Sequence, residues 1–164
     1  MLVYLSGSIE FSTDGGKRWR RELKPFLNGT LGHRVYDPAE DEKKSLTEEE
    51  VRNFRAWKRT DLERFRQTVR KIIHFDLDLL EKQADYVVCY WDRESARGAG
   101  TQAELTAAYR KGVPVYLVTE LPVEEVSGWI LACAERVFGG FVELKGFLAE
   151  QYGQGSHRGT ETQR

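Results

Sequence analysis

Two short apolar runs, joined by one helical segment, constrain the fold of this chain most. Residues 86–91 and 113–118 are almost wholly apolar, as is typical of strands buried on both faces of a parallel sheet. The segment between them, residues 105–111, is expected to be helical. Strand, helix and strand in this order predict a βαβ unit, in which a crossover helix joins two parallel strands.

The same alternation continues over most of the chain. The expected strands are residues 2–5, 33–36, 86–91, 113–118 and 141–142. The expected helices are residues 17–27, 47–72, 76–83, 105–111, 126–137 and 144–152. Thr47 and Glu50 have the spacing of a capping box, which marks a helix start, and a helix break is expected before Asp76. The order predicts one domain, residues 1–152, with helices on both faces of a five-stranded parallel sheet. Residues 153–164 contain no apolar residue and are expected to be a disordered tail.

Composition excludes several classes of function. Twenty-five Lys and Arg residues against 26 Asp and Glu residues give no basic excess, which argues against nucleic acid as a partner. No apolar run approaches a membrane span, and the N-terminus does not resemble a signal peptide. Cys89 and Cys133 lack CxxC spacing, which suggests buried, reduced thiols and a cytoplasmic location. His33, His74 and His157 are scattered without metal-ligand spacing, so we expect no metal site. No cofactor is expected either.

Ligands of open parallel sheets bind at the carboxyl ends of the strands. The loops expected at that edge are residues 6–16, 37–42 and 91–104. In the last of them, the sequence Arg97-Gly98-Ala99-Gly100-Thr101-Gln102-Ala103-Glu104 leads into a helix whose first turn is expected to carry Glu104. Backbone N–H groups at a helix start bind anions and hydroxyls, so Gly100 and Thr101 are candidate substrate contacts and Glu104 a candidate catalytic carboxylate. The alternative is that the helix dipole alone favours Glu104 there.

The first loop combines a glycine with two hydroxyls. Gly7 permits close approach of a ligand, and Ser6 and Ser8 are candidate contacts. Three basic residues between positions 17 and 20 suggest an anion such as a nucleotide 5′-phosphate, or they extend into solvent. Trp19 is a further candidate contact, although it also lies on the apolar face of the expected helix. The loop matches neither the dinucleotide fingerprint nor a Walker A motif.

Five more residues have open interpretations. Asp37 is either a turn residue or a ligand contact. Trp91 is either a residue that stacks on a base or a residue that covers the core. Asp92 is a candidate for binding a sugar hydroxyl. Asp76 and Asp78 lie among apolar residues, where a carboxylate on the buried side of the helix is a candidate general acid. Because positions two apart face different sides of a helix, only one of these two can point inward.

Several segments resemble one enzyme family. The first strand and loop, Val3-Tyr4-Leu5-Ser6-Gly7-Ser8-Ile9, are similar to those of nucleoside 2-deoxyribosyltransferases, which are related to deoxynucleoside 5′-monophosphate N-glycosidases. Asp76-Leu77, followed by residues 83–88, resembles that family's D-L…A-D-V-V stretch. Residues 100–105 and 107–115 resemble its G-x-x-x-E-L…A…G-K-P-V segment. These matches extend over residues 3–118 in the same order.

The resemblance implies a flavodoxin-like or Rossmann-like three-layer α/β sandwich and a homodimer or higher homo-oligomer, in which a neighbouring subunit often completes the site. It implies that Glu104 is the nucleophile and that Asp76, in preference to Asp78, contacts the substrate and assists protonation. The spacing from Asp76 to Asp85 departs from the family pattern. The long first loop also differs from the short phosphate-binding loop of the monophosphate hydrolases, so the phosphorylation state of the substrate stays open.

The expected activity is cleavage or transfer at the N-glycosidic bond of a nucleoside, deoxynucleoside or nucleoside 5′-monophosphate, through a covalent glycosyl-glutamate. Attack by water would make the protein a hydrolase, and attack by a second base a transferase. Residues 98–104 also resemble the G-G-x-G-T-x-x-E motif of lysine-decarboxylase-like phosphoribohydrolases, whose earlier glycine-rich segment is absent here. A non-catalytic sensor of a nucleotide derivative is the alternative from a different class.

Overall fold

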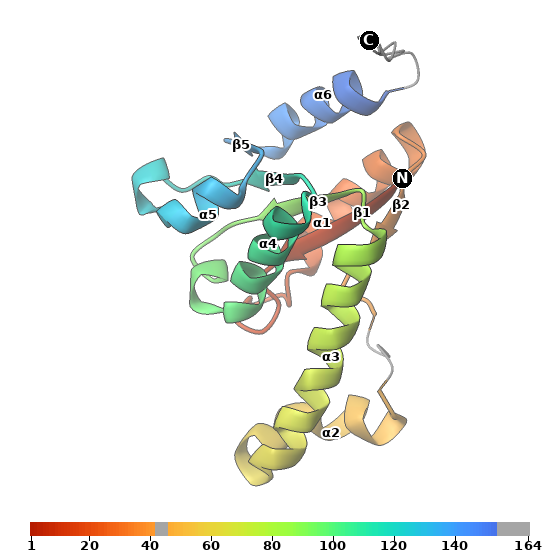
Figure 1. The fold of residues 1–164 in the computed structure, drawn as a ribbon, viewed down its shortest axis with the longest axis vertical. Helices are drawn as coiled ribbons and strands as arrows, with labels where there is room; N and C mark the ends of the chain where they lie inside the picture. Colours follow the sequence, from red (N-terminus) through yellow and green to blue (C-terminus); the bar gives the residue numbers. More distant parts are fainter. Residues whose placement is uncertain (42–45, 154–164) are drawn as a thin grey trace, which may run out of the picture.

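The computed structural model describes residues 1–41 and 46–153, and a five-stranded parallel sheet forms its centre (Figure 1). Its strands are β1 (Leu2–Gly7), β2 (Arg34–Tyr36), β3 (Tyr86–Tyr90), β4 (Val115–Val118) and β5 (Arg136–Phe138). They lie in the order β2-β1-β3-β4-β5, and every neighbouring pair is parallel. This is the flavodoxin-like order, whose topological switch point lies between β1 and β3. The predicted fold class is confirmed.

The α-helices are α1 (Lys17–Pro25), α2 (Glu48–Thr60), α3 (Leu62–Gln83), α4 (Ala99–Lys111), α5 (Gly128–Cys133) and α6 (Phe141–Tyr152). A π-helical turn (Phe26–Thr30) extends α1, and short 3₁₀ turns lie at Ser95–Arg97 and Val123–Glu125. Helices α1 and α6 pack on one face of the sheet, whereas α4, α5 and the C-terminal end of α3 pack on the other. These are the three layers that the sequence predicts.

Alternation along β1 divides its side chains between the two faces. Val3 and Leu5 belong to the core under α1 and α6, and Tyr4 belongs to the core under α4. Because successive side chains of a strand point to opposite faces, Ser6 lies on the same side as Tyr4. This face of β1 therefore presents two hydroxyl groups to α4 near the carboxyl end of the strand.

Helices α2 and α3 form a hairpin whose far end stands away from the sheet (Figure 1). The predicted capping box begins α2: Glu50 N–H donates to Thr47 Oγ1, and Thr47 N–H donates to Glu50 Oε2. The prediction of a helix break before Asp76 is wrong. The break lies at Asp61, whose side chain caps the N-terminus of α3 by accepting a hydrogen bond from Arg64 N–H.

Expectations in two other regions need correction. Helix α4 begins at Ala99, so Glu104 is not in its first turn but one turn further along. The helix expected at residues 126–137 ends at Cys133, and the last strand is Arg136–Phe138 rather than residues 141–142. Gly139 and Gly140 separate this strand from Phe141, which starts α6. In both regions glycines with low helix propensity lie beside helical residues, and the local pattern places the boundary wrongly.

Cys89 and Cys133 are both buried free thiols, as predicted. None of the helices in the described residues is long and apolar enough to cross a bilayer. Most of the tail predicted at residues 153–164 lies outside the described residues.

Candidate active site

The carboxylate of Glu104 is held by two hydroxyl groups from β1. The phenol of Tyr4 donates to Oε1 at 2.8 Å, and Ser6 Oγ donates to Oε2 at 2.5 Å. Tyr4 and Ser6 are fully buried, and Glu104 is half-buried. Burial raises the pKa of Tyr4 well above its usual value, and the charge of Glu104 raises it further, so this phenol stays a hydrogen-bond donor at physiological pH.

A second tyrosine and carboxylate repeat this arrangement on the neighbouring strand. Tyr36 of β2 is the register partner of Tyr4, and the two ring centroids are 5.3 Å apart. The Tyr36 phenol donates to Asp76 Oδ1 at 2.8 Å, and Asp76 is buried. Burial raises the pKa of Tyr36, as does the adjacent charge of Asp76. A cross-strand pair of tyrosines therefore positions two carboxylates, one on α4 and one on α3.

Both carboxylates line one cavity of about 730 Å³. The β1–α1 loop (residues 9–17), the segment after β2 (residues 38–41) and the facing sides of α2 and α3 form its other walls. The cavity opens at the carboxyl edge of the sheet, where ligands of this fold class bind. Its volume lies within the range of small-molecule sites.

The structure separates the two candidate acids. Asp76 lines the cavity, whereas Asp78 is exposed and forms an ion pair of 2.9 Å with Lys82, one turn further along α3. This agrees with the expectation that only one of them points inward. The geometry favours Asp76 for any role in chemistry at this cavity.

Asp37 and Arg20 form a buried ion pair beside the first loop. Arg20 Nε lies 3.4 Å from Asp37 Oδ1, and Lys24 Nζ lies 2.5 Å from Asp37 Oδ2. The Arg20 guanidinium also donates to the carbonyls of Gly16 at 2.7 Å and Gly7 at 3.1 Å. Arg20 is therefore neither solvent-exposed nor available to an anion. Asp37, a candidate substrate contact from the sequence, instead fixes the turn through Ala39 N–H and holds the β1–α1 loop.

The other loop candidates mainly serve the packing of the loops. A Cβ atom on Gly7 would lie 3.0 Å from the Tyr90 carbonyl, so Gly7 permits contact between strands rather than with a ligand. Asp92 accepts hydrogen bonds from Ser95 N–H at 2.7 Å and from Ser95 Oγ at 2.8 Å. Ser8 N–H donates to Ser95 Oγ at 3.3 Å. The buried hydroxyl of Ser8 has no hydrogen-bond partner among the described residues, and Ser8 is not one of the residues that line the cavity.

Both tryptophans proposed as contacts lie in the core. Trp91 is 2% exposed in the cluster beneath α4, and Trp19 is 9% exposed and stacks on Phe141. Neither offers a base a free face, so the structure does not support the stacking expected of Trp91. In the first turn of α4, Gly100 is exposed with open space at its Cβ position, and Thr101 is buried.

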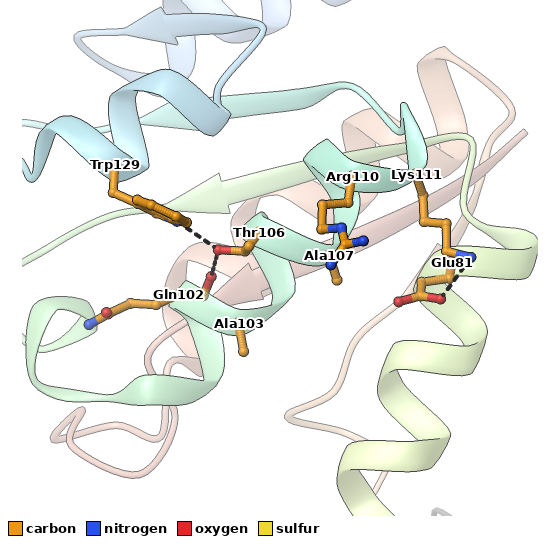
Figure 2. Close-up of a pocket in the computed structure, with 8 residues that line it drawn as sticks. All are labelled: Glu81, Gln102, Ala103, Thr106, Ala107, Arg110, Lys111 and Trp129. Atoms are coloured by element: carbon orange, nitrogen blue, oxygen red, sulfur yellow. Dashed lines mark hydrogen bonds and ion pairs between the residues drawn. The ribbon is translucent and has the colours of Figure 1, made fainter.

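A second hollow, of about 840 Å³, lies on the outer side of α4 (Figure 2). Its lining residues come from α3, α4 and α5, and include Trp129, whose indole N–H donates to Thr106 Oγ1 at 2.9 Å, and the ion pair of Lys111 with Glu81. Neither Glu104 nor Asp76 lines it, so the paired carboxylates belong to the first cavity alone. Over residues 1–41 and 46–153, no group of three His, Cys, Asp or Glu residues could hold a metal ion.

Sequence reasoning placed Glu104 and Asp76 but missed Tyr4 and Tyr36 as site residues. The role of Tyr4 could have been inferred from the sequence. Residues two apart in a strand share a face, so Tyr4 and Ser6 had to present their hydroxyl groups to the same helix layer. The link from Tyr36 to Asp76 joins residues 40 positions apart and needed the sheet register.

The chain was compared with family models, curated proteins and solved structures. No family model and no curated protein matches it. A solved structure of a 2-deoxyribosyltransferase from the psychrotolerant bacterium Bacillus psychrosaccharolyticus is similar, with a TM-score of 0.61 and 21% sequence identity. The match covers 88% of this chain and 90% of that one. The chain therefore shares the fold of that enzyme, in agreement with the resemblance found in the sequence.

Proposed function

We propose that this protein breaks the N-glycosidic bond of a nucleoside, deoxynucleoside or nucleoside 5′-monophosphate and transfers the sugar to water or to a second base. The observation that carries the proposal is the Glu104 carboxylate, held by Tyr4 and Ser6 in a cavity that also contains Asp76. The shared fold with a 2-deoxyribosyltransferase supports it.

In the first step, Glu104 attacks C1′ of the sugar and forms an ester, while the C1′–N bond breaks and its electron pair goes to the base. Positive charge develops at C1′ in the transition state, and a carboxylate beside that carbon stabilises it. The two hydroxyl donors fix the direction of the carboxylate before substrate arrives, so that little reorganisation is needed during the reaction.

The leaving base needs a proton as its bond to C1′ breaks. Asp76 is the carboxyl group of this cavity placed on α3, and Tyr36 holds its orientation. Asp76 in its protonated form delivers the proton, directly or through a water molecule, and the resulting carboxylate takes a proton back from the attacking water or second base in the second step. In the second step, water or a second base attacks C1′ from the opposite side and releases Glu104, so the configuration at C1′ is retained.

Incubation with a panel of nucleosides, deoxynucleosides and their 5′-monophosphates tests this function. Liquid chromatography with mass spectrometry would report released base, exchanged base and any sugar adduct on the peptide that contains Glu104. We expect release or exchange for at least one substrate class. If no member of the panel reacts while one of them clearly raises the melting temperature, the nucleotide-sensor alternative replaces the enzyme.

Replacing Asp76 by asparagine is expected to lower kcat by about 10²-fold or more, because general acid catalysis typically contributes about that factor. The matched control is Asp78→Asn on the same helix, which removes only an exposed ion pair and should change kcat by less than about twofold. Steady-state kinetics on the best substrate of the panel gives kcat for both variants. A larger loss in Asp78→Asn would contradict the assignment.

Replacing Tyr4 by phenylalanine is expected to lower kcat by about tenfold or more with a smaller change in KM, because a hydrogen bond to the charged nucleophile is lost. Tyr116→Phe is the control, since it removes a buried phenol that bonds Tyr152 on the opposite face of the sheet. Equal kcat values for the two variants would show that Tyr4 does not position Glu104.

The resemblance also predicts a homo-oligomer. Light scattering coupled to size-exclusion chromatography measures this directly, and a monomeric enzyme with full activity would remove the expectation that a neighbouring subunit completes the site.

A further inference from the structure

One face of α3 continues from the acid into an apolar wall. Phe65, Val69, Ile72 and Asp76 all line the cavity, at intervals of four, three and four residues. This spacing places them on a single stripe of the helix. Because an α-helix rises 1.5 Å per residue, the stripe extends about 16 Å from Asp76 to Phe65.

Apolar residues also line this part of the cavity from the α2 side. Leu46 and, on α2, Val51 and Phe54 line it, and each is half-buried. Phe54 and Phe65 come from different helices and stack on each other, with ring planes within 8° of parallel and centroids 6.5 Å apart, and both line the far end of this part of the cavity. We call this part of the cavity, which α2 and α3 line beyond Asp76, the apolar arm.

The order of Glu104, Asp76 and the apolar arm along the cavity indicates where the sugar and the base of a bound nucleoside lie. Glu104 lies over the end of β1, so the sugar carbon that it attacks belongs there. Asp76 comes next, beside the leaving base, and the apolar arm begins beyond it. The apolar wall continues for about 16 Å along α3 from Asp76, so an unsubstituted base beside Asp76 leaves the apolar side chains at its far end without contact.

We propose that the natural leaving group is a nucleobase with an apolar, planar substituent that fills this arm. The inference rests on the proposed function for the position of the sugar. Burying the substituent against Phe54, Val69 and Ile72 would remove apolar surface from water on both partners, which is the main source of affinity in such sites.

Charge in the cavity favours a neutral substituent over an anionic one. Five acidic residues line the cavity against three basic ones. Lys58 forms an ion pair with Glu10, and Arg55 lies over the Phe54 ring, 5.0 Å from its centroid. An anionic substituent would meet Asp76 and Glu104 with few compensating charges.

Isothermal calorimetry with free adenine and N6-benzyladenine tests the arm without any reaction, because neither base has a glycosidic bond. We expect N6-benzyladenine to bind at least tenfold more tightly than adenine. Adenine carrying an N6-succinyl group is the anionic comparison and should bind no better than adenine. Equal affinities for the first two bases, preference for the succinyl base, or no measurable binding of any of them would overturn the proposal.

Val69→Trp supplies the structural test, since it fills the middle of the arm. We expect this variant to bind the two bases with affinities within about twofold of each other. Ile73→Trp is the control: Ile73 lies on the same helix, is 49% exposed and does not line the cavity, so the tenfold preference should remain. Phe54→Ala is a second variant that removes one aromatic wall, and it should lower the affinity for N6-benzyladenine alone. Loss of the preference in Ile73→Trp but not in Val69→Trp would overturn the location.

Turnover assays with the deoxyribosides of the same bases distinguish failure of the proposed function from failure of the inference about the apolar arm. Turnover of unsubstituted nucleosides without any preference for the benzyl base would leave the proposed function intact and overturn the inference about the arm. Tight binding of N6-benzyladenine without turnover of any nucleoside would keep the arm as a binding site and overturn the enzymatic function.

Discussion

Glu104→Gln is expected to lower turnover by about 10⁴-fold or more while the protein stays folded, because the amide cannot form the ester with C1′. Glutamine has the shape of glutamate, and the Tyr4 and Ser6 hydroxyls can still pair with its oxygen and nitrogen atoms. Base release measured by liquid chromatography gives the rate, and the melting temperature confirms that the fold is retained.

A second variant makes the role of Glu104 specific. Glu104→Ala leaves a space beside the sugar that sodium azide can enter, and an azide ion can then attack C1′ in place of the carboxylate. We expect azide to restore base release in Glu104→Ala and to produce a glycosyl azide of inverted configuration, visible by nuclear magnetic resonance. Full turnover by either variant without azide would exclude Glu104 as the nucleophile.

The layers of the fold were predictable because their signal is local. Buried parallel strands such as Tyr86–Tyr90 read as unbroken apolar runs, and the helices between them show a separate period. The boundaries were less predictable. In the charged stretch from residue 48 to residue 83 the helical spacing continues across the true boundary, and the break was predicted before Asp76. The boundary between α2 and α3 lies at Asp61, a good N-cap followed by Glu63.

The candidate site was predictable where a rule about the sheet edge applied, and unpredictable where a partner lay far along the chain. The edge rule brought attention to Glu104, although its helix begins one turn earlier than expected. The rule also selected Asp37, Trp91 and Asp92, which the fold uses for an ion pair, for the core and for a turn. Such residues are chosen by partners at long range, and a linear pattern does not contain those partners.

The same limit applies to the apolar arm. Phe54, Val69 and Ile72 have the spacing of ordinary core residues, and the sequence gives no reason to place them elsewhere. In the structure, the far end of the α2–α3 hairpin stands away from the sheet (Figure 1), and these side chains face a cavity that no other element fills among the described residues. An apolar stripe becomes a candidate for recognition only when its covering layer is known.

Asp37→Ala is expected to destabilise the protein by about 3 kcal/mol or more, because it leaves the fully buried Arg20 guanidinium without its carboxylate. Burial lowers the pKa of Arg20, and the charge of Asp37 is the largest effect that opposes this shift. For a chain of this size the loss corresponds to a fall in melting temperature of roughly 10 °C. Thermal unfolding followed by circular dichroism measures it.

Glu40→Ala is the matched control, because Glu40 pairs with the same Lys24 at 2.6 Å but its side chain is 66% exposed. An exposed pair contributes less than about 1 kcal/mol, so the melting temperature of this variant should stay within a few degrees of the parent value. The Asp37 variant should also lose activity below its own melting temperature, since Arg20 holds the carbonyls of Gly7 and Gly16 and therefore the loop that walls the cavity. Similar melting temperatures for the two variants would show that the buried pair does not hold this loop in place.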